Sequence, residues 1–115
     1  MNNPSRIIIF FAAVLLNTVV ASAADGQKLY ITNCASCHGT DGKGRTPAGK
    51  KLGAHDLTQS KLADAEIEKQ IVVGTTDSKG NSRMPSFKSV LQPEDIAALV
   101  AYVSALRAGP GVSGK

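Results

Sequence analysis

The chain has 115 residues, a formal net charge of +4, 43% hydrophobic residues and two cysteines. This length fits one small domain, and such a domain has little capacity for an apolar core of its own. The modest positive charge gives no basis for nucleic-acid binding, a function that we exclude.

The N-terminal residues 1–24 differ in composition from the rest of the chain. Arg6 supplies a positive charge, residues 7–20 are almost entirely apolar, and an Ala-Ser-Ala sequence follows at once. This order is typical of a secretory signal peptide that is cleaved after Ala23 or Ala24. A retained membrane anchor is the alternative, although the uninterrupted apolar run is short for a membrane span of about 20 residues.

We therefore expect three segments: residues 1–24 as a cleaved signal peptide, residues 25–108 as one domain and residues 109–115 as a flexible tail. Cleavage removes Arg6 and lowers the net charge from +4 to +3. Export places the domain in the periplasm, and no membrane span is expected after cleavage.

Residues 25–34 predict the first helix of the domain. Asp25 suits the N-cap position, and Leu29 and Asn33 lie four residues apart on a shared face. Gly26 lowers the helix propensity of the first turn, which indicates that another part of the backbone comes close at this point.

This helix leads into Cys34-Ala35-Ser36-Cys37-His38, a C-x-x-C-H motif that is specific for the attachment of c-type haem. The thiols of Cys34 and Cys37 are three positions apart and can add to the two vinyl groups of one porphyrin. His38 then lies beneath the iron, where an imidazole nitrogen can serve as an axial ligand. The motif therefore predicts one covalently attached haem c.

The cysteine pair has three other interpretations. A thioredoxin-like dithiol requires a preceding strand and a βαβ unit, which the sequence does not indicate. A zinc site would need a second cysteine pair, and the chain has two cysteines in all. A structural disulfide across so short a loop would stabilise the fold only weakly.

The segment that follows the motif, residues 39–53, contains five glycines and one proline and is predicted to be a polar loop. Within it, residues 44–51 resemble a phosphate-binding loop. Lys51 stands where that loop requires Ser or Thr, and no strand precedes it, so nucleotide binding is discounted.

A second helix is predicted over residues 64–73, where Ile67 and Ile71 share one face. Residues 75–83 then predict another polar loop, with a turn at residues 79–81.

The last helix is the clearest prediction from the sequence. Pro93 suits its first position, two acidic residues follow, and Arg107 and Gly109 mark its end. Its apolar residues keep helical spacing: Ile96, Leu99, Val100, Val103 and Leu106. Because no segment shows convincing strand alternation, the predicted fold class is all-α, with about three to five helices.

Met84 is the candidate for the second axial iron ligand, since Met1 is lost with the signal peptide. It lies 46 residues after His38 and is followed by Pro85, which limits the backbone there. A thioether ligand favours ferrous iron and raises the reduction potential. The alternatives are that Met84 fills a gap in the core, that His55 is the ligand, or that a lysine amine is.

Four features together resemble a small class I c-type cytochrome of the short bacterial kind. They are the C-x-x-C-H motif after a short helix, the Gly-Thr-Asp-Gly-Lys-Gly sequence that follows it, the Met84-Pro85 dipeptide and the amphipathic terminal helix. The resemblance implies a class I cytochrome c fold wrapped around one haem. It also implies that the first and last helices cross at four positions: Gly26, Tyr30, Leu99 and Tyr102.

The resemblance further implies that a proline in the loop after the histidine supports the iron ligand. Its backbone carbonyl accepts the other imidazole N–H, which fixes the ring and increases its donor strength. Pro47 is the best match, although Thr46 stands where the family has glycine.

A haem with both axial positions filled leaves no site for a substrate. We therefore expect a one-electron carrier between redox proteins, and not an enzyme. The alternatives are a haem-bearing subunit of a larger oxidase or dehydrogenase, and a haem enzyme or gas sensor in which Met84 dissociates.

A monomer is expected, and redox proteins are the expected partners. The stretch between Gly42 and His55 contains four basic residues and no acidic one: Lys43, Arg45, Lys50 and Lys51. Such a segment would steer a partner with an acidic docking face. Ordinary solvated surface is the alternative.

Overall fold

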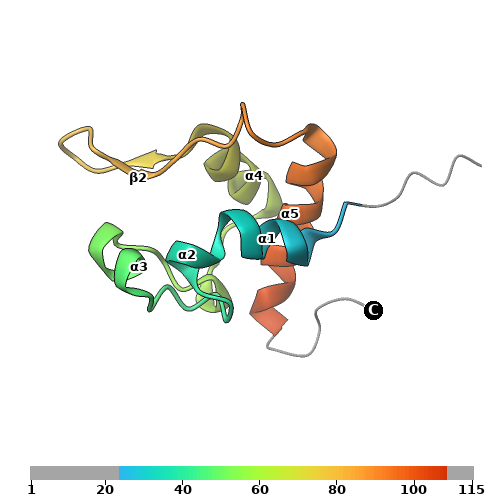
Figure 1. The fold of residues 1–115 in the computed structure, drawn as a ribbon, viewed down its shortest axis with the longest axis horizontal. Helices are drawn as coiled ribbons and strands as arrows, with labels where there is room; N and C mark the ends of the chain where they lie inside the picture. The colour runs from blue at the N-terminus through green and yellow to red at the C-terminus, as the bar shows by residue number, and fades with distance from the viewer. Residues whose placement is uncertain (1–23, 109–115) are drawn as a thin grey trace, which may run out of the picture.

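The computed structural model describes residues 24–108. The predicted signal peptide apart from Ala24, and the predicted tail with Gly109, lie outside these residues. The elements in chain order are α1 Gly26–Asn33, α2 Ala35–His38, α3 Pro47–Leu52, η1 Leu57–Gln59, α4 Asp64–Val73, β1 Thr75–Thr76, β2 Ser82–Met84, α5 Pro93–Ala105 and η2 Leu106–Ala108 (Figure 1). The prediction of a mostly helical fold is confirmed. No helix within residues 24–108 is long and apolar enough to cross a membrane.

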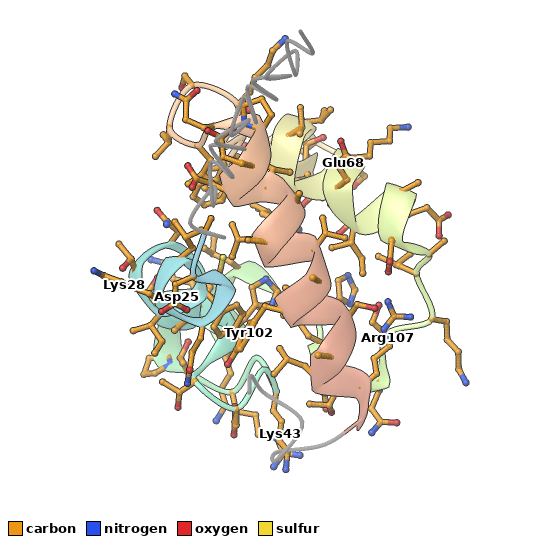
Figure 2. The ribbon with its side chains drawn as sticks, turned by 90° about the vertical axis from the view of Figure 1, so that its right-hand side faces the viewer. Asp25, Lys28, Lys43, Glu68, Tyr102 and Arg107 are labelled. Atoms are coloured by element: carbon orange, nitrogen blue, oxygen red, sulfur yellow. The ribbon has the colours of Figure 1, made fainter. Side chains whose placement is uncertain are left out.

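Helices α1 and α5 cross in close contact, and Gly26 marks the crossing. A Cβ atom at Gly26 would lie 2.5 Å from the backbone oxygen of Ala98 and 3.0 Å from Cβ of Tyr102. Tyr102 lies on the side of α5 that faces α1, with its ring centroid 5.1 Å from that of Tyr30 (Figure 2). The close approach expected at Gly26 is therefore observed, and a side chain there would separate the two helices.

The core is formed mainly by α1, α4 and α5, in which α1 and α4 both pack against α5. Tyr30 and Leu99 are both 0% exposed and lie at its centre. The other buried hydrophobic residues around them are Ile67, Ile71, Leu91, Ile96 and Val103. The helical spacing that predicted α4 and α5 therefore supplies most of this core.

Helices α4 and α5 begin at their predicted positions, and each start is capped in the same way. The backbone N–H of Ala63 donates to the Glu66 carboxylate at 2.8 Å, and that of Gln92 donates to the Asp95 carboxylate at 3.0 Å. Each carboxylate also lies near the positive end of its helix, where negative charge is favourable.

Two segments predicted as loops contain regular structure. Residues 47–52 form α3, which begins with Pro47 and ends before Gly53, whose φ of +70° is left-handed. Both residues had been interpreted as loop formers, but they also suit the start and end of a helix.

Residues 75–84 form the second such segment, a short antiparallel ribbon in which Thr75 pairs with Met84. The Asp77 carboxylate accepts the backbone N–H groups of Lys79 and Asn81, each at 2.9 Å, and so closes the turn. Strands of two and three residues are too short to leave an alternating pattern in the sequence.

Candidate haem site

The two cysteines and His38 lie on one turn of helix directly after α1. Cys34 ends α1 and precedes α2, which carries Cys37 and His38. The His38 N–H donates to the Cys34 carbonyl at 2.9 Å, so the segment is wound as a helical turn. Residues three apart on a helix share a face, with Cβ atoms about 5–6 Å from each other. Both cysteines are free and half-buried, so no disulfide joins them.

The backbone immediately after His38 is held by the core. The Tyr30 hydroxyl donates to the Gly39 carbonyl at 2.6 Å in a buried hydrogen bond, and the Gly44 N–H donates to the His38 carbonyl at 2.8 Å. Burial raises the pKa of the Tyr30 phenol above its usual value, with a smaller effect from Cys34, so the hydroxyl keeps its proton at neutral pH. Tyr30, a buried residue of α1, thus fixes the position of the backbone that follows the C-x-x-C-H motif.

Thr46 joins α2 to α3, a role that the sequence analysis missed. Its hydroxyl oxygen lies 2.7 Å from the Ser36 carbonyl and 3.0 Å from the Cys37 carbonyl, and it accepts the Gly49 N–H at 2.9 Å. The single hydroxyl hydrogen of Thr46 is therefore shared between two carbonyls of α2, and its oxygen caps the start of α3. Threonine directly before a proline at the first helical position is a recognisable N-cap signal.

His38 faces a backbone carbonyl through one of its ring nitrogens. Its Nδ1 lies 3.2 Å from the carbonyl oxygen of His55. A carbonyl can only accept, so the hydrogen of this bond is on Nδ1 and the lone pair of a neutral ring is on Nε2. Burial lowers the pKa of His38, which favours the neutral ring that metal ligation needs, while the bond to His55 acts in the opposite direction.

The carbonyl opposite His38 was predicted to be that of Pro47, and this prediction is wrong. Pro47 begins α3 and is exposed, whereas His55 lies in the segment after α3. The physical reason is that any residue carries a carbonyl, so only the path of the chain decides which one reaches the ring. His55 is therefore adjacent to His38 through its backbone, and its side chain is exposed.

Met84 lies at the end of β2, on a different part of the fold from the cysteine motif. It is half-buried and packs against the core. Gly74 allows this approach, since a Cβ there would lie 2.5 Å from the Met84 carbonyl. Just after Met84, the Ser86 hydroxyl donates to the Val72 carbonyl and the Phe87 N–H donates to the Ile71 carbonyl at 2.9 Å. The methionine segment is thus attached to α4.

The electrostatics of the Cys34 thiol agree with a half-buried attachment site. Burial raises the pKa of the Cys34 thiol to about 11, with a further contribution from Cys37, so this thiol is protonated at neutral pH. Within the described part of the chain, no group of three or more His, Cys, Asp or Glu side chains is placed to hold a metal ion. The zinc interpretation has no ligand set there, whereas two free thiols for attachment, together with an imidazole and a thioether as iron ligands, are the groups that c-type haem requires.

Three comparisons with known proteins all point to the same family. The cytochrome c family model matches residues 23–107. Cytochrome c6 of Anabaena variabilis is 35% identical over 88 residues, covering 72% of this chain and 90% of that protein. The Cbb3-type cytochrome c oxidase subunit FixP of Bradyrhizobium diazoefficiens is 34% identical over 88 residues, covering 76% of this chain and 28% of that protein. The solved structure of the KustC0563 c-type cytochrome has a TM-score of 0.62 and 38% identity, covering 72% of this chain and 98% of that one.

Proposed function

This chain belongs to the cytochrome c family, and we propose that it is a one-electron carrier with a single, covalently attached haem c. When bound, the haem supplies an iron that accepts and releases one electron. The observation that carries the proposal is the turn of α2, where two free thiols and a histidine with a carbonyl-bonded Nδ1 lie together.

Cys34 and Cys37 hold the group covalently in this proposal. Each thiol would attach one vinyl group of the haem as a thioether, with the S–H hydrogen transferred to the second vinyl carbon. The hydrogen bond that the Thr46 hydroxyl shares between the carbonyls of Ser36 and Cys37 holds the backbone of this turn in place.

His38 and Met84 are the proposed axial ligands of the iron. The bond from His38 Nδ1 to the His55 carbonyl orients the ring and leaves Nε2 as the donor nitrogen. Met84 comes from the hairpin that is attached to α4, and not from the α2–α3 segment. His55 is a poor candidate for the second position, because its backbone is bonded to the proximal ligand.

With His38 and Met84 as its ligands, the iron would have no position free for a substrate, so we propose no catalytic role. Electron exchange in such a site would require little rearrangement of the residues that hold the ligands. A haem enzyme or gas sensor would instead need Met84 to dissociate readily.

The partner is proposed to be a redox protein with an acidic docking face. The four basic residues of the 43–51 segment are exposed: Lys43, Arg45, Lys50 and Lys51. Lys43 and Glu68, which lies on α4, are at opposite ends of the molecule in Figure 2. Association through the basic segment should therefore slow as ionic strength rises. A salt-independent rate would contradict this part of the proposal.

Location and assembly complete the proposal. Residues 1–24 are proposed to direct export to the periplasm and to be cleaved, leaving residues 25–108 as the haem domain and residues 109–115 as a tail. The domain is proposed to act as a monomer that shuttles between membrane-bound or periplasmic redox proteins.

A second candidate is a haem-bearing subunit of a larger oxidase. It is favoured by the 34% identity to FixP, an oxidase subunit of which the matched region is 28%. Isolation of the tagged protein from its own host separates the two candidates, because a subunit would remain with its complex through gel filtration and a carrier would elute alone.

The optical spectrum of the mature protein, made in a host that attaches haem, tests the main proposal. We expect a covalent c-type haem with the ferric methionine–sulfur charge-transfer band, and loss of that band in Met84→Ala. His55→Ala is the matched control and should keep the band. Absence of the band in wild type, or ready binding of carbon monoxide to the reduced protein, would contradict His/Met ligation.

A further inference from the structure

The segment around Met84 is held by the rest of the molecule in two places. Hydrogen bonds join it to α4, whereas one side chain joins it to the end of α3. Bonds from Ser86 and Phe87 join the segment to α4. Toward the α2–α3 half of the molecule, Arg83 Nη1 donates to the Leu52 carbonyl at 3.2 Å. Among the hydrogen bonds within residues 24–108, this is the one that joins residues 75–92 to residues 34–59. In Figure 1 the hairpin and α3 lie on the same side of the molecule.

The end of α3 is well suited to receive an arginine. Leu52 is the last residue of the helix, where carbonyls lack helical partners and the dipole favours a cation. Gly53 leaves space for the guanidinium, because a Cβ at Gly53 would collide with Arg83 Nη1. Arg83 thus contacts both the carbonyl and the glycine that ends the helix.

Arg83 also precedes Met84 directly on the three residues of β2. Successive side chains of a strand point to opposite faces, and Arg83 is exposed while Met84 is half-buried. Holding the arginine on the outer face therefore holds the methionine toward the inside.

We infer that Arg83 is a positioning residue that fastens the Met84 segment to α3 and so slows the release of Met84 from the iron. This inference rests on the proposed role of Met84 as an axial ligand. Arg83 itself does not touch the reacting atoms and acts through the strand that it shares with Met84.

The rate at which added imidazole binds to the ferric holoprotein measures how often Met84 leaves. Loss of one exposed hydrogen bond of this kind typically changes an equilibrium constant by roughly fivefold. In Arg83→Ala we expect imidazole to bind about threefold to tenfold faster, with the methionine–sulfur band still present before addition. Arg83→Lys keeps the charge but not the planar donor group, and should lie between wild type and Arg83→Ala.

Lys79→Ala is the matched control, since it removes one positive charge from the turn of the same hairpin. Its side chain makes no hydrogen bond with the residues that the structure describes, and its imidazole rate should equal that of wild type. If Arg83→Ala also gives the wild-type rate, the positioning role is wrong while His/Met ligation stands. If wild type has no methionine–sulfur band, the ligand proposal fails, and the inference about Arg83 fails with it.

A double-mutant cycle with Gly53→Ala tests the contact itself. The new methyl group would displace the guanidinium, so Gly53→Ala alone should also speed imidazole binding. In the Arg83→Ala background the same change should speed imidazole binding by a smaller factor, because the guanidinium that it would displace is already absent. The left-handed strain at Gly53 is common to both backgrounds and cancels. Additive effects of the two substitutions would overturn the proposed contact.

Discussion

In the half of the molecule built from α1, α4 and α5, buried aliphatic and aromatic side chains pack against one another. In the half built from α2, α3 and the loops around them, the principal contacts are hydrogen bonds to backbone carbonyls. Tyr30 and Leu99 represent the first half, and Thr46 represents the second. The first half therefore depends on side-chain volume, whereas the second depends on single polar atoms and on the haem that it is proposed to hold.

Truncation at the centre of the packed half should have the largest effect. Leu99 is 0% exposed, and Leu99→Ala is expected to lower the free energy of unfolding by about 3 kcal/mol through lost burial and a cavity. Denaturant unfolding of the holoprotein measures this change. Val90→Ala, at a residue that is 63% exposed, is the control and should change it by less than about 0.5 kcal/mol. Equal effects at both residues would contradict the assignment of the core.

In the polar half, loss of one hydroxyl should be nearly as costly. Thr46→Val keeps the shape of the side chain but removes the cap of α3 and the partner of the Cys37 carbonyl. We expect the free energy of unfolding to fall by about 2 kcal/mol, and Thr46→Ser to restore most of it. Faster amide exchange at Gly49 in the valine variant alone would locate the effect. If Thr46→Ser is destabilised as much as Thr46→Val although it keeps the hydroxyl, the hydroxyl does not account for the stability, and the capping role fails.

The Tyr30 hydroxyl connects the two halves, and the stability that it contributes should depend on pH. Tyr30→Phe keeps the ring but leaves the Gly39 carbonyl without its donor, so we expect a loss of about 1 to 2 kcal/mol at pH 7. The raised pKa of Tyr30 means that the folded protein keeps the phenol proton when the unfolded chain loses it near pH 10. Wild type therefore loses stability above about pH 10, and its advantage over the phenylalanine variant should shrink there. Denaturant unfolding of both proteins at pH 7 and pH 11 tests this. If the difference in unfolding free energy is the same at both pH values, the pKa of Tyr30 is not higher in the folded state than in the unfolded chain.

The same division explains how far the sequence alone could predict the structure. Helix α4 was predicted with the bounds that it has, because an acidic first turn, Ile67 and Ile71, and a terminal glycine all agree. The close approach at Gly26 was predicted because glycine is unfavourable in a helix without such a reason. These signals belong to the packed half, where side-chain type decides the structure.

The sequence of the polar half contains weaker indications of its structure. Helix α3 was missed because its six residues are too few for a periodic pattern, and because Pro47 and Gly53 also mark turns. The carbonyl opposite His38 was assigned to Pro47 and not to His55, since backbone atoms carry no sequence signature. The contact between Arg83 and Leu52 joins residues 31 positions apart, and no local pattern indicates it.

The smallest expected effect is local, in the turn of the hairpin. A hydrogen bond from the Asn81 side chain, followed by bonds from the backbone N–H groups, lowers the pKa of Asp77. A carboxyl with a lowered pKa stabilises the fold above its unfolded pKa of about 4, and this contribution disappears as pH falls through the lower folded value. In Asp77→Asn we expect faster exchange of the Lys79 and Asn81 amides than in wild type at pH 7, with the difference vanishing in acid. Because short hairpins open locally, the global unfolding midpoint should hardly move. A difference in exchange that persists below pH 2 would show that the shape of the side chain, and not its charge, closes this turn.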